Sequence, residues 1–339
     1  AEACVQGVRQ RLAAFFGAPE PERVVFCANA TEALNLAIFG LVRPGGHVIS
    51  TRLEHNSVLR PLHHLEQTGK IYSTLVGFDA AGVVDPEDIA RAVRADTCLV
   101  IVNHASNVLG SIQPVAEIGR ICAERAIPLL IDAAQTAGAL PIDMRAWQIS
   151  ALAFTGHKAL LGPTGIGGLV SMPHLDISPT RFGGTGLESR NPDQPASFPH
   201  RLETGTLNVL GIMGLGFGLE YLEEAGVSDT YRQKLELVKR LRQELTAMDR
   251  VRVYGSPSVN GQVPILSCNI AGMHPSDAGM ILDGDHDIAV RTGLHCAPLL
   301  HEDLGTAPAG AVRFSLGWDT RPQDIDRAAK AVASMAKMS

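Results

Sequence analysis

The stretch FTGHKALLGPTGIGGL, residues 154 to 169, contains Lys158, the residue whose type and position most directly suggest catalysis. Lys158 follows the apolar run ALAFTGH, and Thr155 and His157 stand beside it as hydrogen-bonding groups. Glycines at 162, 165, 167 and 168 would let the backbone approach a ligand closely or adopt positive φ. A desolvated lysine in such a place loses its proton readily and can form a Schiff base. A solvated surface lysine is the other interpretation of this residue alone.

Two further polar residues stand at the edges of apolar runs. Asp132 ends the run PLLID, where a buried carboxylate needs a cationic partner. A pyridinium nitrogen would be such a partner, and an N-cap for a following helix is the alternative. Thr31 lies in NATEAL, which begins a predicted helix whose N-terminus could bind a phosphate group.

Cys296 differs in its surroundings from the other five cysteines, which lie in apolar patterns or near the amino end. It sits in the turn-like segment GLHCAPL. Nucleophilic chemistry at this position would require a thiolate, which His295 or Arg291 could favour electrostatically.

The elements that must position these residues alternate between strands and helices. Six β-rich runs are expected to be strands, at residues 23–29, 47–52, 70–78, 97–104, 128–134 and 151–157. Helical patterns lie between several of them, at 31–42, 86–93 and 115–126. This alternation predicts a mostly parallel, doubly wound α/β sheet. Ligands bind such sheets outside the carboxyl ends of the strands, where Asp132 and Lys158 are expected.

The pattern changes near residue 225. A predicted buried helix at 207–222 precedes a charged amphipathic helix at 228–248, four short strand-like runs (VRVYG, VPILSCNIAG, DIAVRTG and AVRFSLG) and a closing helix at 322–337. We therefore expect a large domain over residues 1–225 and a smaller α+β domain over residues 226–339, which carries the Cys296 loop. The loop at 182–201 is long and rich in Gly and Pro, which is typical of a functional or mobile segment.

The composition of the 339 residues excludes several classes of protein. A net charge of -6 argues against nucleic acid or an anionic membrane as the partner. No apolar run is long enough to cross a bilayer, and no secretory signal opens the chain. The six cysteines form no CxxC pair, which favours reduced thiols in a cytoplasmic protein. The twelve histidines lack ligand spacing, so no metal is expected.

Several motifs together resemble one family. They are NATEALNL, RLEHNSV, NHASNVLG, IDAAQTAG, FTGHKALLGPTGIGGL, RLETGTLN, AVRTGLHCAPL and AVRFSLG. Their order resembles the fold-type I pyridoxal 5'-phosphate (PLP) enzymes of aminotransferase class V, and most closely the cysteine desulfurases and selenocysteine lyases. This family usually has a further amino-terminal segment with an Asp-Asn-Ala-Ala-Thr-like strand, which we expect the large domain to lack.

The resemblance implies a role for each matching residue. Lys158 would hold PLP as a Schiff base, Asp132 would pair with the pyridine nitrogen, Gln135 would face the ring oxygen and His55 would stack on the ring. The phosphate would be bound by the segment of Ala30 and Thr31, by Thr155 and His157, and by Thr206 of the other subunit of a homodimer. The substrate carboxylate would be held by Asn107 and Arg313, with Arg291 nearby.

The implied reaction converts L-cysteine to L-alanine and transfers the sulfur to Cys296, from which an acceptor protein could take it. Asn29 and Ala30 replace the family's usual Gly-Thr, and Leu294 replaces the first histidine of the common His-His-Cys. These departures leave two alternatives open: a class V enzyme of other specificity, such as a selenocysteine or C–S lyase, or a weakly catalytic scaffold that binds a partner through residues 182–201.

Overall fold

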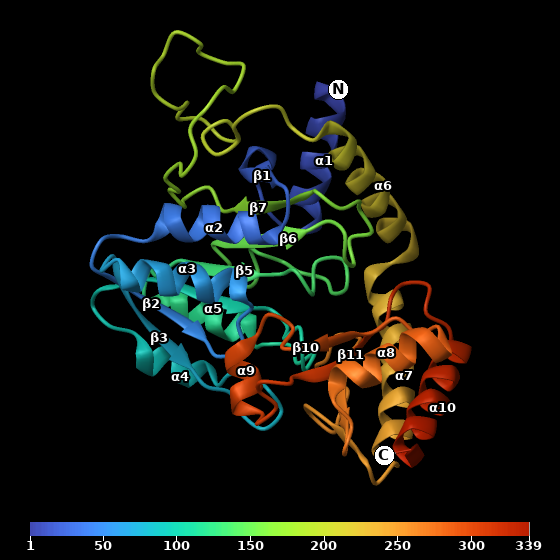
Figure 1. The fold of residues 1–339 in the computed structure, drawn as a ribbon. Helices are drawn as coiled ribbons and strands as arrows, with labels where there is room; N and C mark the ends of the chain where they lie inside the picture. Colours follow the sequence, from blue (N-terminus) through green and yellow to red (C-terminus); the bar gives the residue numbers. More distant parts are fainter. Residues whose placement is uncertain (339) are drawn as a thin grey trace.

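The computed structural model describes residues 1–338, and its largest element is a seven-stranded sheet in the order β1-β7-β6-β5-β4-β2-β3 (Figure 1). The strands are β1 (Val24–Cys27), β2 (Gly46–Thr51), β3 (Ile71–Val76), β4 (Thr97–Asn103), β5 (Leu129–Asp132), β6 (Ala151–Thr155) and β7 (Gly167–Ser171). β7 is antiparallel to both its neighbours, whereas β3, β2, β4, β5 and β6 are parallel. The predicted doubly wound, mostly parallel sheet is therefore confirmed.

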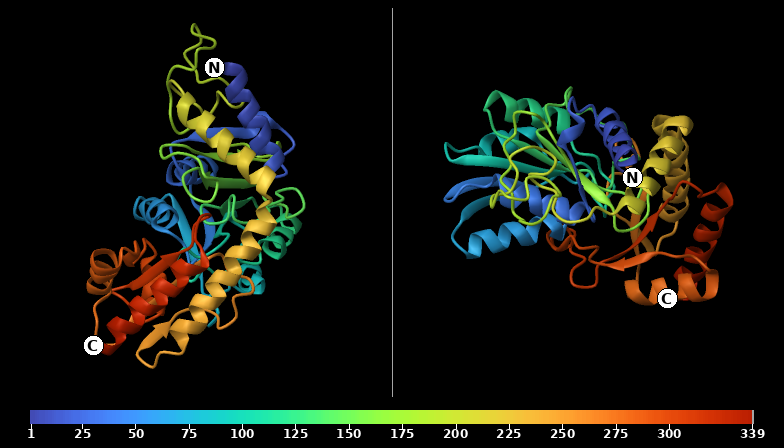
Figure 2. Two further views of the ribbon diagram at one scale, coloured as in Figure 1. Left: turned by 90° about the vertical axis from the view of Figure 1, so that its right-hand side faces the viewer. Right: turned by 90° about the horizontal axis from the view of Figure 1, so that it is seen from above.

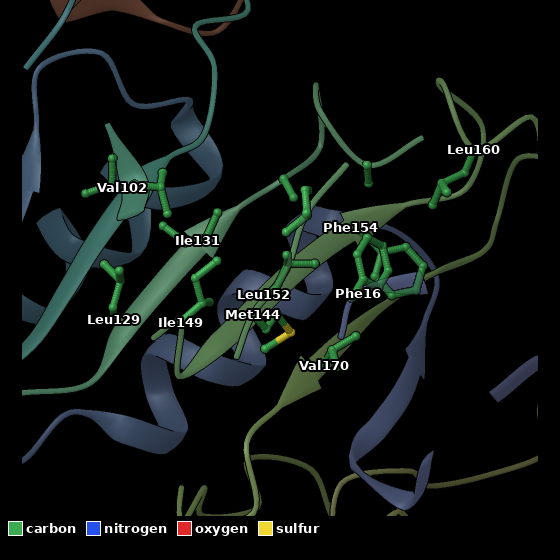
Figure 3. Packing of buried hydrophobic residues seen from close by; sticks show 14 of the residues in the cluster. Phe16, Val102, Leu129, Ile131, Met144, Ile149, Leu152, Phe154, Leu160 and Val170 are labelled. Atoms are coloured by element: carbon green, nitrogen blue, oxygen red, sulfur yellow. The ribbon is translucent and has the colours of Figure 1, made fainter. Parts of the chain in front are cut away.

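Helices cover both faces of this sheet. They are α1 (Glu2–Phe15), α2 (Ala30–Leu41), α3 (Asn56–Gln67), α4 (Pro86–Ala92), α5 (Val115–Glu124) and α6 (Val209–Ala225), with a 3-10 turn at η1 (Pro21–Arg23). Alternate strand residues face two separate cores: α2 and α3 cover one side, and α1, α4, α5 and α6 cover the other. Figure 3 shows the second core, where Phe16 of the segment after α1 packs against Phe154 of β6.

The remaining chain forms a second, smaller unit. Its antiparallel sheet has the order β10-β11-β9-β8, formed by β8 (Val251–Val253), β9 (Ile265–Ile270), β10 (Arg291–Gly293) and β11 (Ala311–Ser315). Its helices are α7 (Val227–Thr246), α8 (Pro275–His286), α9 (Pro298–Asp303) and α10 (Pro322–Met338). Figure 2 shows α6 and α7 following one another along one side of the molecule. The proposed domain division falls at their junction, Gly226, where φ is 77°.

Two local expectations were wrong. No strand was expected between residues 158 and 225, but Gly167 and Gly168 belong to β7, between β1 and β6. A Cβ on Gly167 would lie 2.6 Å from the carbonyl oxygen of Phe154, so close strand packing requires glycine there. The helix expected to be buried, α6, is exposed along one side, where Leu210 is 81% and Phe217 67% accessible.

Two other features bear on the site. The segment 182–201 forms no helix or strand and extends away from the sheet at the end near α1 (Figure 1). Within residues 1–338, no helix is long and apolar enough to cross a membrane.

Candidate active site

A cavity of about 250 Å³ opens where the parallel strands β2, β4, β5 and β6 end. Polar side chains line most of it. The lining residues are Asn29, Ala30, Thr31, His55, Ser57, Asn103, Ala105, Asn107, Asp132, Ala134, Gln135, Thr155, His157 and Lys158. Nine residues predicted from the sequence to bind a cofactor or substrate are thus brought to one cavity at the carboxyl edge of the sheet, as expected for this fold class.

Asp132 lies at the floor of the cavity as the last residue of β5, beside Asn103 at the end of β4. Its Oδ1 accepts a hydrogen bond of 2.9 Å from the backbone N–H of Ala134. No helix begins after β5, because the chain enters a series of turns over residues 133–140. The alternative role as a helix N-cap is therefore wrong, and the buried carboxylate remains available to a cationic group in the cavity.

Lys158 follows β6 by three residues and reaches into the same cavity. Its side chain is accessible to the solvent there, although protein surrounds it on most sides. This desolvation lowers the pKa of Lys158, and the negative charge of Asp132 opposes the effect, while Arg313 and Arg291 reinforce it. A lowered pKa makes more of the neutral, nucleophilic amine available.

One end of the cavity is suited to an anion. The N-terminus of α2 is capped by Asn29, whose Oδ1 accepts from the N–H of Glu32 at 3.0 Å. The N–H groups of Ala30 and Thr31 have no intrahelical acceptors, because they lie in the first turn. The Oγ1 of Thr31 lies 2.7 Å from Ser57 Oγ, so hydroxyl groups surround this helix end. Such an arrangement binds phosphate.

Thr155 and His157 lie at the cavity beside Lys158. Thr155 Oγ1 and His157 Nδ1 are 3.0 Å apart. Burial lowers the pKa of His157, and the charge of Lys158 lowers it further, which favours a neutral ring that can donate to or accept from a ligand.

His55 is the N-cap of α3. Its Nδ1 accepts from the N–H of Ser57 at 3.0 Å, which leaves the proton of a neutral ring on Nε2. Burial lowers the pKa of His55, and Asp132 opposes this. Ser57 Oγ lies 2.8 Å from the same Nδ1 and also contacts Thr31, so it links the ring to the anion end.

Cys296 reaches the site from the smaller unit, in the segment between β10 and α9. Its carbonyl accepts from the N–H of Asn56 at 2.7 Å, and Asn107 Nδ2 donates to the carbonyl of His295 at 2.7 Å. Arg291 donates to Cys296 Sγ at 3.3 Å. Cys296 is half-buried and lines a groove of about 490 Å³ together with residues of α2 and α3.

The expectation that His295 could favour the thiolate is wrong, whereas Arg291 lies where it can. His295 is buried, and this burial lowers the pKa of its imidazole to about 3, so the ring is neutral at physiological pH. Four other cysteines are fully buried (Cys27, Cys98, Cys122 and Cys268). Burial raises the pKa of Cys122 and of Cys268 to about 12, which makes these thiols unreactive.

Arg313 and Asn107 form the border between the two units. Arg313 donates to the carbonyl of Asn107 at 2.9 Å, and its buried Nε has no partner. Burial lowers the pKa of Arg313 to about 10, and the neighbouring cation Arg291 adds to the effect. Asn107 Oδ1 is also buried without a partner. An anionic group such as a carboxylate would compensate the guanidinium charge here.

The structure does not bring every predicted residue to the cavity. Thr206 is exposed in the segment before α6 and does not line it. Its predicted role in a partner subunit stays a prediction.

Three polar residues at the cavity or directly below it were missed: Ser57, Asn103 and Glu54. Glu54 is fully buried and accepts from Thr51 Oγ1 at 2.8 Å and from the N–H of Asn103 at 3.0 Å. Burial raises the pKa of Glu54 to about 8, and the negative charge of Asp132 contributes. The one sequence signal for it is an acidic residue directly before His55 at the end of an apolar strand.

Known proteins share this architecture. The profile of the Aminotransferase class-V family matches residues 1–328. A probable cysteine desulfurase of Methanothermobacter thermautotrophicus is 35% identical over 98% of this chain and 84% of its own length. A cysteine desulfurase of Pectobacterium atrosepticum is 32% identical over 96% of this chain and 81% of its own.

Solved structures agree with the sequence relatives. The apo structure of a cysteine desulfurase from Thermococcus onnurineus superposes with a TM-score of 0.92 at 32% identity, covering 99% of this chain and 84% of that chain. The cysteine desulfurase CsdA of Escherichia coli gives a TM-score of 0.92 at 26% identity, with the same coverage.

Proposed function

Because the chain belongs to the aminotransferase class V family of PLP-dependent enzymes, we propose that it is a cysteine desulfurase that transfers sulfur from L-cysteine to Cys296. The observation that carries this proposal is the position of Cys296, which the smaller unit presents beside His55 at the border of the cavity that contains Lys158.

The residues of the cavity fit PLP. The first turn of α2 with Thr31, Thr155 and His157 would bind the phosphate, and Asp132 would pair with the ring nitrogen. Gln135 would face the ring oxygen, and His55 would cover the ring. Lys158 would attach the cofactor, since its amine has a lowered pKa and lies in the same cavity as Asp132. When bound, PLP supplies an electron sink for negative charge at the substrate Cα.

The chain's own residues would supply the remaining steps. Arg313 holds the carboxylate of L-cysteine through its buried, unpaired Nε, and lines an adjoining cavity that shares Lys158 with the first. Asn107 donates to the same carboxylate through the second hydrogen of its Nδ2, whose first hydrogen bonds the carbonyl of His295. Lys158, once neutral, takes the Cα proton as general base.

The thiolate of Cys296 then attacks the sulfur of the substrate, and the C–S bond breaks. The electron pair of the C–S bond stays with the substrate, whose Cβ takes up a proton, and Cα regains the proton that Lys158 removed. The products are L-alanine and a persulfide on Cys296. A reductant or an acceptor thiol removes the outer sulfur. Arg291 stabilises the attacking thiolate from 3.3 Å.

We also propose that two copies form a homodimer, with Thr206 of each copy contributing to the other's phosphate site. The exposed apolar residues Leu210, Met213, Phe217 and Tyr221 lie on one side of α6, directly after Thr206, and support this. Sedimentation of the PLP-loaded protein tests it: a fully active monomer would exclude the proposal.

The deciding experiment measures alanine and sulfide released from L-cysteine in the presence of a thiol reductant, for the native chain and for Cys296→Ser. We expect the native chain to release both, and the variant to lose at least about 100-fold in rate while retaining PLP. Cys4→Ser, a change at the other half-buried cysteine, is the control and should behave as native.

The other outcomes identify other functions. Equal activity of the native chain and Cys296→Ser would exclude Cys296 as the acceptor and indicate a lyase. A native chain that retains little PLP after purification would indicate a scaffold.

A further inference from the structure

Two histidines pack behind Cys296, outside the cavity. His295 and His301 are 2% and 0% exposed, and their rings meet edge to edge, with centroids 5.5 Å apart and an interplanar angle of 27°. Neither ring lines the cavity or the groove of Cys296. Their role in the site is therefore not to touch a substrate.

The hydrogen bonds of the pair run in one direction. His295 Nε2 lies 3.2 Å from the carbonyl oxygen of Arg291, which can only accept, so Nε2 carries the proton. The ring's Nδ1 then accepts from His301 Nε2 at 3.3 Å. This leaves His301 Nδ1 as an acceptor for the hydroxyl of Thr306 at 2.7 Å. The order of donation is therefore Thr306 to His301 to His295 to Arg291.

This order requires that both rings are neutral. A proton added to His295 Nδ1 would place two donors face to face, and one added to His301 Nδ1 would turn the Thr306 hydroxyl to the carbonyl of His301, 3.3 Å from its Oγ1, and so break the order. Burial lowers the pKa of His295 to about 3 and that of His301 to about 4, so both rings stay neutral at physiological pH. His295 is therefore not a base for the neighbouring thiol.

The backbone in front of the pair has an unfavourable conformation. His295 and Cys296 have φ values of 50° and 59°, in the left-handed region that non-glycine residues seldom adopt. Such residues persist only where surrounding contacts hold them. The side chain of His295 ties the loop back to the carbonyl of Arg291, the residue whose guanidinium contacts Cys296 Sγ.

We propose that Thr306, His301 and His295 are positioning residues that hold the Cys296 loop in its left-handed conformation and so keep the thiol against Arg291. They act through the loop and do not exchange protons with the thiol. Any effect of this loop conformation on sulfur transfer rests on the proposed function. The position of the Cys296 thiol beside Arg291 can be tested without enzymatic turnover.

Several charged or titratable groups face the thiol, and their ionisation and screening must be the same in every measurement. Lys158, Arg291 and Arg313 act on it from the side of the two sheets. His55, Arg60 and His64 line the groove on the side of α3. All measurements should therefore share one pH and one ionic strength.

The experiment compares the rate at which iodoacetamide alkylates Cys296, followed by mass spectrometry in the full chain. Cys4 serves as the reference thiol within each molecule, since it is the other cysteine that is not fully buried. The variants are His301→Leu, which removes both hydrogen bonds, and His301→Gln, which keeps a donor toward His295. Thr306→Val removes the first donor of the same series of hydrogen bonds and is a smaller change in side-chain size.

We expect the ratio of the Cys296 rate to the Cys4 rate to fall about threefold to fivefold in His301→Leu, the same change that loss of the Arg291 charge gives, because the variant moves the thiol away from that guanidinium. His301→Gln should recover most of this loss, and Thr306→Val should show a smaller one. In the His301→Leu background, Arg291→Gln should have no further effect, because the thiol has already left the guanidinium. A purely structural role of the histidines would leave the effect of Arg291→Gln intact.

An unchanged ratio in His301→Leu, or an undiminished effect of Arg291→Gln in that background, would overturn the proposal. If His301→Leu fails to fold, Thr306→Val and His301→Gln carry the same comparison. Sulfide release from L-cysteine tests the proposed function separately, because alkylation is measured whether or not the protein desulfurates cysteine.

Discussion

The two sides of the active site are built differently. On one side, Asp132 and Thr155 are the last residues of β5 and β6, and Lys158 follows three residues later. On the other side, Cys296 lies in a loop with positive φ values, and hydrogen bonds from other elements hold it: Asn56 and Asn107 from the larger unit, and the His295–His301 pair from its own. The sheet side is fixed by its strands, whereas the loop side is fixed by contacts between elements.

Because of this difference, substitutions on the two sides should have different effects. Groups at the ends of paired strands keep their places as long as the sheet is formed, so substitutions there should affect chemistry more than geometry. The loop side depends on a few hydrogen bonds, each worth about 1 kcal/mol, so its reactivity should respond in small steps.

The largest expected effect is that of Lys158→Ala on the sheet side. The variant should fold and lose at least about 100-fold in activity, because the general base and the attachment point of PLP are both removed. Borohydride reduction followed by mass spectrometry should link PLP to the native chain and leave the variant unmodified. Lys234→Ala is a matched control: the pKa of Lys234 is also lowered by desolvation, but its amine donates to the carbonyl of Thr320 and it does not line the PLP-binding cavity. Cofactor linked to the variant would mean that another lysine carries PLP.

The sheet side was also the more predictable from sequence. Apolar runs that end in a polar residue predicted β1 to β6. Because ligands bind at the carboxyl ends of parallel strands, Asp132 and Lys158 were predicted to lie at the same edge of the sheet. β7 was missed because its glycines resemble a turn, although they are needed for close packing against Phe154. Glu54 was missed because nothing in RLEH indicates that the acid is fully buried.

The loop side could be predicted only through family resemblance. Cys296 is 138 positions from Lys158 in the chain, and no periodicity indicates that the two lie at one site. His301 has no motif of its own, and its partner His295 was interpreted as an electrostatic aid to the thiol. Burial, which sets the pKa of His295, is a tertiary property that short sequence patterns do not contain.

The second prediction concerns Glu54, the buried acid beneath the sheet side. Because folding raises its pKa from 4.5 to about 8, its contribution to stability is complete below about pH 4.5 and is lost as the pH rises through 8. Glu54→Gln has no such ionisation. The free energy of unfolding of the native chain should therefore fall relative to the variant by up to about 4 kcal/mol between pH 4.5 and pH 9.

Urea unfolding at a series of pH values measures this difference. Glu66→Gln is the matched control, because Glu66 also accepts from a backbone N–H and a hydroxyl, both of Ser73, but is only half-buried. The pH dependence of the Glu66→Gln difference is the baseline for the comparison. A Glu54→Gln difference that depends on pH no more than this baseline would mean that Glu54 ionises normally despite its burial.

The smallest expected effect is that of Arg291→Gln on the loop side. Arg291 is solvent-exposed, so its attraction to the Cys296 thiolate is screened and should change the alkylation rate only about threefold to fivefold at low salt. The change should shrink as ionic strength rises, which a hydrogen bond to a neutral thiol would not do. Arg250→Gln, at an exposed arginine that donates to the carbonyl of Ala271, is the control and should leave Cys296 unaffected. If Arg291→Gln lowered the rate a hundredfold, the loop side would be as dependent on single groups as the sheet side, and the contrast between them would fail.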